Sequence, residues 1–88
     1  MIVLDPTVRA GSVAIAAVCR VTIDVIPHGR GGGTGIAAWA SKTPLAILVA
    51  QDRRIRALSP SGEDLPMPEL EAQAPGAATR FRAQVAQG

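Results

Sequence analysis

The sequence predicts a small α+β domain in which a mostly antiparallel sheet of about four strands precedes a C-terminal helical segment. Two observations support the sheet: β-branched and aliphatic residues fill positions 12–26 and 44–50, and a loop rich in glycine lies between them. A third supports the helical segment, because the composition after Pro66 shifts to Ala, Glu, Gln and Arg.

A chain of 88 residues corresponds to one domain. We expect a lead-in strand or arm over 1–10, a β core over 11–58 and a helical tail over 66–87. Hydrophobic residues make up 48% of the chain, but Trp39 and Phe81 are the only aromatic ones. A core of Ala, Val, Ile and Leu buries little area in so short a chain, so we expect a homo-oligomer, most simply a dimer.

The first long strand is predicted over 12–26, with a bend near Ala16 and Ala17 because fifteen residues are many for one strand. From Cys19 onward, apolar and polar residues alternate with a period of two, which predicts one face on a core and one in water. The apolar positions are Cys19, Val21, Ile23 and Val25, and the polar ones are Arg20, Thr22 and Asp24.

The following residues, 27–35, contain five glycines and predict a turn or loop. A short strand over 36–41 is expected to end before Thr43 and Pro44. The apolar run 44–50 then predicts a separate central strand, buried on both faces and flanked on both edges.

A turn at 51–53 and a strand over 54–58 with Ile55 inside complete a hairpin. The polar segment 59–64 predicts a loop. Pro66 and Pro68 allow a helix to begin, and this helix ends before Pro75 and Gly76. The segment 77–87 predicts a second helix with one apolar stripe, formed by Ala78, Phe81 and Val85.

The charge of +2 comes from eight arginines and one lysine against seven acidic residues. Arg53, Arg54 and Arg56 cluster in the sequence, with Arg80 and Arg82 further on, and we interpret them as a solvated face. Nucleic acid is an improbable partner, because a dense basic stripe with interleaved aromatic residues is missing.

The single cysteine, Cys19, excludes an intrachain disulfide and a cysteine-based metal site, and we interpret it as a buried structural residue. The N-terminal residues do not resemble a secretory signal, and the apolar stretch 10–19 is too short to span a membrane. We therefore expect a cytoplasmic protein without a membrane partner.

The segment 33–38 matches the dinucleotide fingerprint G-x-G-x-x-A, and Asp52 lies 19 residues after Gly33. A crossover helix does not fit between Gly35 and Pro44, so we expect no nucleotide cofactor. No lysine follows the glycines, which excludes a P-loop. A weak anion or ligand site remains open in the loop, formed by Arg30, Gly31, Gly33 and Gly35.

His28 is the only histidine, and we interpret it as solvated, although a role as general base stays open. We predict no catalytic residue and no metal ligand. Trp39 and Phe81 are the candidates for a dimer interface, because large aromatic side chains supply much contact area.

The order of four motifs resembles the YtfJ or GerW family of sporulation proteins. They are Gly11–Val18 as a valine-rich strand, the glycines of 29–35, the proline and aliphatic strand of 43–49, and the Ile55-Arg56-Ala57-Leu58 part of 54–58. The resemblance covers about residues 11–58. It implies a related core and a link to spore germination, and it implies no catalytic residue.

These observations favour a non-enzymatic structural or assembly protein that acts through self-association. The alternatives are a small ligand- or anion-binding module that uses the glycine-rich loop, and a small enzyme with His28 as its base.

Overall fold

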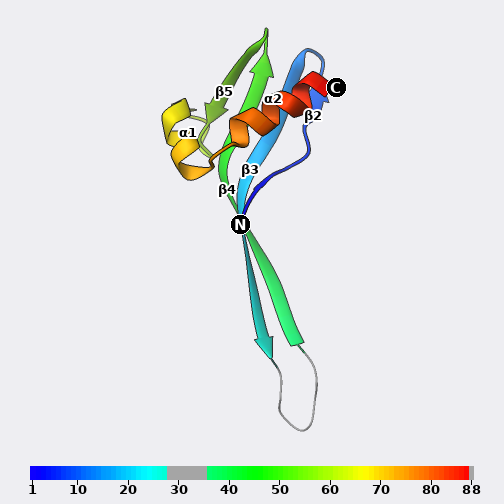
Figure 1. Cartoon of the computed structure of the whole chain (residues 1–88), viewed down its shortest axis with the longest axis vertical. Coiled ribbons are helices and arrows are strands. Elements are labelled where there is room, and N and C mark those ends of the chain that lie inside the picture. The colour runs from blue at the N-terminus through cyan, green and yellow to red at the C-terminus, as the bar shows by residue number, and fades with distance from the viewer. Residues whose placement is uncertain (28–35, 88) are drawn as a thin grey trace.

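A computed structural model describes residues 1–27 and 36–87 of the chain. It has an antiparallel sheet with two helices, which confirms the predicted α+β class (Figure 1). The described strands are β1 (Ile2–Leu4), β2 (Val8–Ala10), β3 (Val13–Pro27), β4 (Ile36–Gln51), β5 (Arg54–Leu58) and β6 (Asp64–Leu65). The helices are α1 (Met67–Gln73) and α2 (Ala77–Gln87).

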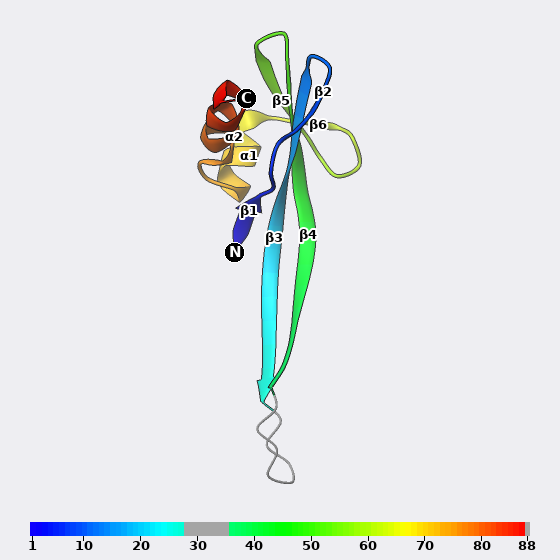
Figure 2. The same ribbon diagram turned by 90° about the vertical axis from the view of Figure 1, so that its right-hand side faces the viewer.

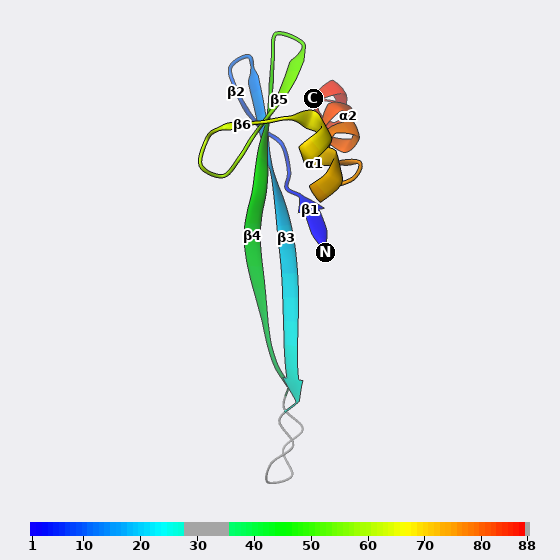
Figure 3. The same ribbon diagram turned by 90° about the vertical axis from the view of Figure 1, so that its left-hand side faces the viewer.

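The sheet has six strands in the described residues, against the predicted four, in the order β1-β3-β4-β5-β6 with β2 also paired to β3. β1 and β2 lie one after the other along the same edge of β3, opposite 18–20 and 13–15 respectively. Figures 2 and 3 show that both helices cover one face of this sheet. Two strands were missed by the sequence pattern because β2 and β6 have only three and two residues.

The core lies between the helices and the covered face of the sheet. Alternate residues of β3 and β4 point into it, which fits the period of two of a strand. The largest fully buried side chains are Phe81, Leu48, Leu70 and Val18, and the remainder of the cluster is alanine: Ala14, Ala16, Ala46, Ala50, Ala57, Ala74, Ala77 and Ala78. The helices therefore pack on a sheet of mostly very small side chains.

The apolar run 44–50 has neighbours on both edges from Ile47 onward, as predicted, because β3 and β5 flank it. The expectation that both its faces are buried is wrong. Leu48 is fully buried, whereas Ile47 and Val49 are only half-buried because no helix covers their face. The run is aliphatic on both faces although only one of them meets the core.

Pro44 does not separate two strands, so the prediction of a strand break at Thr43 and Pro44 is wrong. β4 runs without interruption from Ile36 to Gln51. The register shifts here: Cys19 pairs with Pro44 and Val18 with Ala46, so Leu45 is the extra residue of a bulge. Proline, which lacks an N–H group, is tolerated in strands at bulges and at open edges. Pro44 lies both beside the bulge and on an open edge, because β5 begins to pair with β4 only at Ile47.

The predicted turn at 51–53 is a two-residue connection between β4 and β5. Asp52 and Arg53 occupy it with φ angles of 52° and 64°. Both lie in the left-handed region that two-residue hairpin turns of this kind require and that glycine favours. In β5 the buried residue is Ala57, and Ile55, which was expected inside, is half-buried.

The helical tail follows the prediction closely. Pro66 occupies the N-cap position of α1, and Pro68 lies in the first turn, where its missing N–H leaves no helical bond unmade. Gly76 lies between the helices with φ 81°, and α2 buries Ala78 and Phe81. The N-terminal residues are fastened to this tail, since Thr7 Oγ1 donates to Gln84 Oε1 over 2.5 Å.

Candidate functional site

The most prominent feature of the molecule is a two-stranded hairpin that extends beyond the rest of the fold (Figures 1 and 2). We call residues 22–27 of β3 and 36–41 of β4 the projecting hairpin. They pair continuously from Thr22–Ser41 to Pro27–Ile36. Six residues per strand span about 20 Å at about 3.3 Å per residue.

Every residue of the projecting hairpin whose side chain is described is exposed to solvent. Ile23, Val25 and Trp39 have exposed fractions of 59%, 57% and 50%. The alternation that predicted a core face for Ile23 and Val25 is therefore present, but no core lies opposite it. That prediction is wrong because Ile23 and Val25 alternate with the core residues Ala14, Ala16 and Val18 of β3, so they lie on the face of the sheet that no helix covers.

The pairing assigns these apolar residues to two faces. Residues opposite each other in an antiparallel pair share a face, so Ile23 lies with Ala40 and Trp39 lies with Asp24. Val25, two residues from Ile23, is on the same face as Ile23. One face therefore carries Ile23 and Val25 side by side, and the opposite face carries Trp39.

The backbone edges of the hairpin differ in what protects them from further pairing. Charged residues, proline and bulges protect strand edges. Along β4 these devices are concentrated at Lys42, Pro44 and the Leu45 bulge, near the body of the fold. The segment 36–41, with the sequence IAAWAS, has none of them, whereas β3 carries Asp24 and Pro27 over its half. In the described residues no strand pairs with the outer edge of β4 before Ile47.

The base of the hairpin is fixed by the N-terminal residues. Val21 N donates to the Met1 carbonyl over 2.7 Å, and Asp5 N donates to the Ala17 carbonyl over 2.9 Å. Lys42 Nζ contacts both carboxylate oxygens of Asp5, at 2.8 and 3.0 Å. This hydrogen bond, aided by the charge of Asp5, raises the pKa of the Lys42 ammonium above its usual value of 10.5.

Cys19 lies beside this ion pair and is buried with a free thiol, as the sequence predicted. Its Sγ is 3.9 Å from Asp5 Oδ2.

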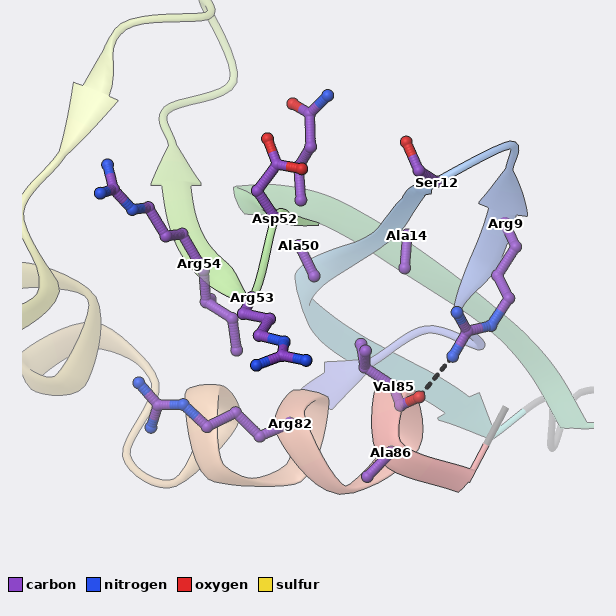
Figure 4. A pocket seen from close by; sticks show the side chains of 12 residues that line it. Arg9, Ser12, Ala14, Ala50, Asp52, Arg53, Arg54, Arg82, Val85 and Ala86 are labelled. Carbon is purple, nitrogen blue, oxygen red and sulfur yellow. Dashed lines mark hydrogen bonds between the residues drawn. The ribbon is translucent and has the colours of Figure 1, made fainter.

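An open cavity of about 370 Å³ lies at the opposite end of the molecule, between β2, the β4–β5 turn and α2 (Figure 4). Its apolar wall includes Ala14, Ala50, Ile55 and Val85. Arg9, Arg53, Arg54 and Arg82 also line it. In Figure 4 the Arg53 guanidinium extends toward α2, and Arg54 points away from the other arginines. Arg9 Nη2 donates to the carbonyl of Val85 in the last turns of α2.

The structure only partly brings the predicted site residues together. Arg30, Gly31, Gly33 and Gly35, proposed for an anion site, lie outside the described residues, and so does His28. Trp39 is on the exposed hairpin, where it can meet a partner. Phe81 is fully buried against the sheet, so its assignment to an interface is wrong: the only phenylalanine supplies the core.

The five arginines are exposed, as the sequence suggested, but they do not form one face. Arg56 pairs with Asp64 over 2.8 Å, on another part of the sheet, whereas Arg53, Arg54 and Arg82 line the cavity with Arg9. Sequence reasoning missed Arg9 because the contact joins positions 76 residues apart. The one local signal was Asp52-Arg53, which occupies a two-residue turn where glycine is usual.

Comparison of the chain with protein-family models, with curated proteins and with solved structures found no match. Within residues 1–27 and 36–87, no group of three His, Cys, Asp or Glu side chains is placed to hold a metal ion. In the same part of the chain, neither helix has the length and hydrophobicity that crossing a membrane requires.

Proposed function

We propose that this protein is a non-enzymatic assembly protein whose copies associate through the projecting hairpin. One observation carries the proposal: a hairpin with three large apolar side chains stands clear of the fold, with neither face covered by described residues. The motif resemblance to the YtfJ and GerW sporulation proteins agrees with a structural role, and that kinship is part of the proposal.

The energetics of a two-stranded hairpin support association. An isolated two-stranded hairpin is at best marginally stable in water, and a third strand or a packed face is needed to hold it. Exposed apolar side chains also gain about 25 cal/mol for each Å² that a partner removes from water. A hairpin that projects with Ile23, Val25 and Trp39 exposed therefore gains both order and burial when a partner covers it.

The unprotected edge of 36–41 favours a second copy of this chain as the partner. A strand edge without charge or proline is a template for another strand. Two copies of this edge can pair antiparallel about a two-fold axis, which is the commonest symmetry of soluble oligomers. Such pairing joins the two hairpins into one four-stranded sheet. It also places Ile23 and Val25 of both copies on the same face of that sheet.

Sedimentation velocity at several protein concentrations tests the proposal. We expect the wild-type chain to sediment as a dimer or larger, and the variant Ile23→Ser/Val25→Ser/Trp39→Ser to sediment as a monomer. A circular dichroism melt of the triple variant should show a folded body, because none of the three side chains contacts the core cluster.

Val8→Ser is the matched control, because Val8 is also an exposed β-branched residue but lies on β2, in the body. This variant should assemble like the wild type. A monomeric wild-type chain at all concentrations, or a triple variant that assembles as the wild type does, would refute the proposal.

A further inference from the structure

We propose that the cavity between β2, the β4–β5 turn and α2 binds a small ligand that carries a phosphate or carboxylate group on an apolar body. This inference is independent of the hairpin, which lies at the other end of the molecule (Figure 1). It rests on three features of the cavity: its charge, the backbone of one of its arginines and its apolar wall.

The first feature is the positive charge of the cavity wall. Arg9, Arg53 and Arg82 come from three separate elements and line one cavity. The ion pairs among the described residues are Lys42–Asp5 and Arg56–Asp64, so none of these three arginines has a carboxylate within 4.0 Å there. Asp52 is the only acidic residue of the wall, and Figure 4 shows its carboxylate directed away from the Arg53 guanidinium. An oxyanion in this cavity is attracted by the positive charge of these guanidinium groups.

Arg9 is held in place for such a role. Its Nη2 donates to the Val85 carbonyl near the C-terminal end of α2, where the helix dipole favours a cation. The guanidinium carries five N–H donors in a fixed fork, so one bond to the helix leaves further donors for a ligand. Phosphate and carboxylate groups match this fork geometry.

The second feature is the backbone of Arg53. Its φ of 64° costs a residue with a Cβ about 1 kcal/mol or more, a cost that glycine avoids. Strained backbone of this kind is concentrated at functional sites. Arginine at this turn is therefore unfavourable for folding. A ligand-binding role of its guanidinium, which extends toward α2, would explain why arginine stands there.

The third feature is the apolar part of the wall, Ala14, Ala50, Ile55 and Val85. A bare inorganic ion gains nothing from such a surface, whereas a ligand with an apolar body does. The volume of about 370 Å³ lies within the range of small-molecule sites, roughly 300–1,000 Å³. The cavity therefore fits an amphiphilic anion.

Isothermal titration calorimetry on the full chain tests this inference with four probes: phenyl phosphate, benzoate, inorganic phosphate and phenol. We expect phenyl phosphate or benzoate to bind more tightly than inorganic phosphate, and phenol not to bind. Whichever of these two probes binds more tightly identifies the anionic group that the site prefers. Absence of binding by both would overturn the proposal.

Arg53→Gly separates binding from folding. This substitution removes the guanidinium and relieves the backbone, so the melting temperature should stay the same or rise, while affinity falls about tenfold to a hundredfold, the equivalent of one charge-assisted hydrogen bond. Arg82→Gln should weaken binding in the same way. Arg80→Gln, on the same helix but outside the cavity wall, should leave it unchanged.

The same variants distinguish a specific anion site from non-specific attraction to a basic surface. If Arg80→Gln lowers affinity as much as Arg53→Gly and Arg82→Gln do, the anion is attracted by net charge and the site is not specific. A short DNA duplex that binds more tightly than phenyl phosphate, with equal losses in all three variants, would replace the small-ligand site with a nucleic-acid surface.

Discussion

The two halves of the long β3–β4 pair follow the same antiparallel pattern and meet opposite environments. The half formed by 13–20 and 46–51 is flanked by β1, β2 and β5 and covered by both helices. The half formed by 22–27 and 36–41 has no described neighbour on either edge or either face. Periodicity alone describes both halves equally well, so burial is decided here by which face, and which part of that face, the helices cover.

The sizes of the apolar side chains in the two halves are the reverse of what burial alone would suggest, because the larger ones are exposed. The covered face of the sheet is built largely of alanine, with Ala14, Ala16, Ala46 and Ala50 in the two long strands. The hairpin carries Ile23, Val25 and Trp39 in contact with water. Small side chains let the helices approach the sheet closely, whereas large exposed ones are typical of surfaces that meet a partner. This contrast is the main support for association through the hairpin.

The largest expected effect compares a buried leucine with an exposed isoleucine on the two halves of the same pair. Leu48→Ala should lower the free energy of unfolding by about 2–5 kcal/mol, because it leaves a cavity beneath the helices. Ile23→Ala should change the stability of the monomer by less than about 0.5 kcal/mol. Urea unfolding measures both, and equal losses would contradict the division into a packed body and a free hairpin.

A second prediction concerns the connection between the helices that cover the body. Gly76 has φ 81°, and a Cβ there would meet no atom within 4 Å, so conformational strain is the only cost of a side chain. Gly76→Ala should destabilise the fold by about 1 kcal/mol. Gly76→Asn is the matched variant, since asparagine tolerates this conformation better, and it should lose less. Equal melting temperatures for the wild type and both variants would refute this account.

Removal of the hairpin should change stability no more than Gly76→Ala does. Thr22 and Ser41 face each other, so replacing 23–40 by Asn-Gly closes the pair with a tight turn. We expect the unfolding free energy of the shortened monomer to stay within about 1 kcal/mol of the full chain, because no described side chain of the hairpin belongs to the core. A shortened chain that fails to fold would show that the body depends on the hairpin.

Much of the fold follows from local patterns, and most of the candidate sites do not. The bounds of β3, β5 and α2 could be predicted because each has a clear period and a proline, glycine or turn at its ends. The continuity of β4 through Pro44 could not, because it depends on a bulge opposite Cys19 and on an edge that β5 leaves open. The arginine-lined cavity needs Arg9 and Arg82 on the wall of one cavity, which only the folded chain provides.

The smallest expected effect is at the base of the hairpin, where Lys42 pairs with Asp5. A lysine whose pKa is raised on folding stabilises the fold fully below its unfolded pKa, and this contribution is lost as pH rises through the folded value. The chain has no tyrosine and no second lysine, so few other groups titrate in this range. Urea unfolding between about pH 9 and pH 12 should show a small decline above about pH 10. Lys42→Gln should remove this decline, and an unchanged decline would assign it to another group.

Hydrogen exchange at two protein concentrations tests the central claim most directly, because it reports on the hairpin residue by residue. Amides of 22–25 and 39–41 should exchange rapidly in dilute protein and become protected as concentration rises, while amides of 14–18 and 46–50 stay protected throughout. Protection confined to the hairpin, and absent from the Ile23→Ser/Val25→Ser/Trp39→Ser variant, is the predicted result. Hairpin amides whose exchange is the same at every concentration would contradict association through this segment.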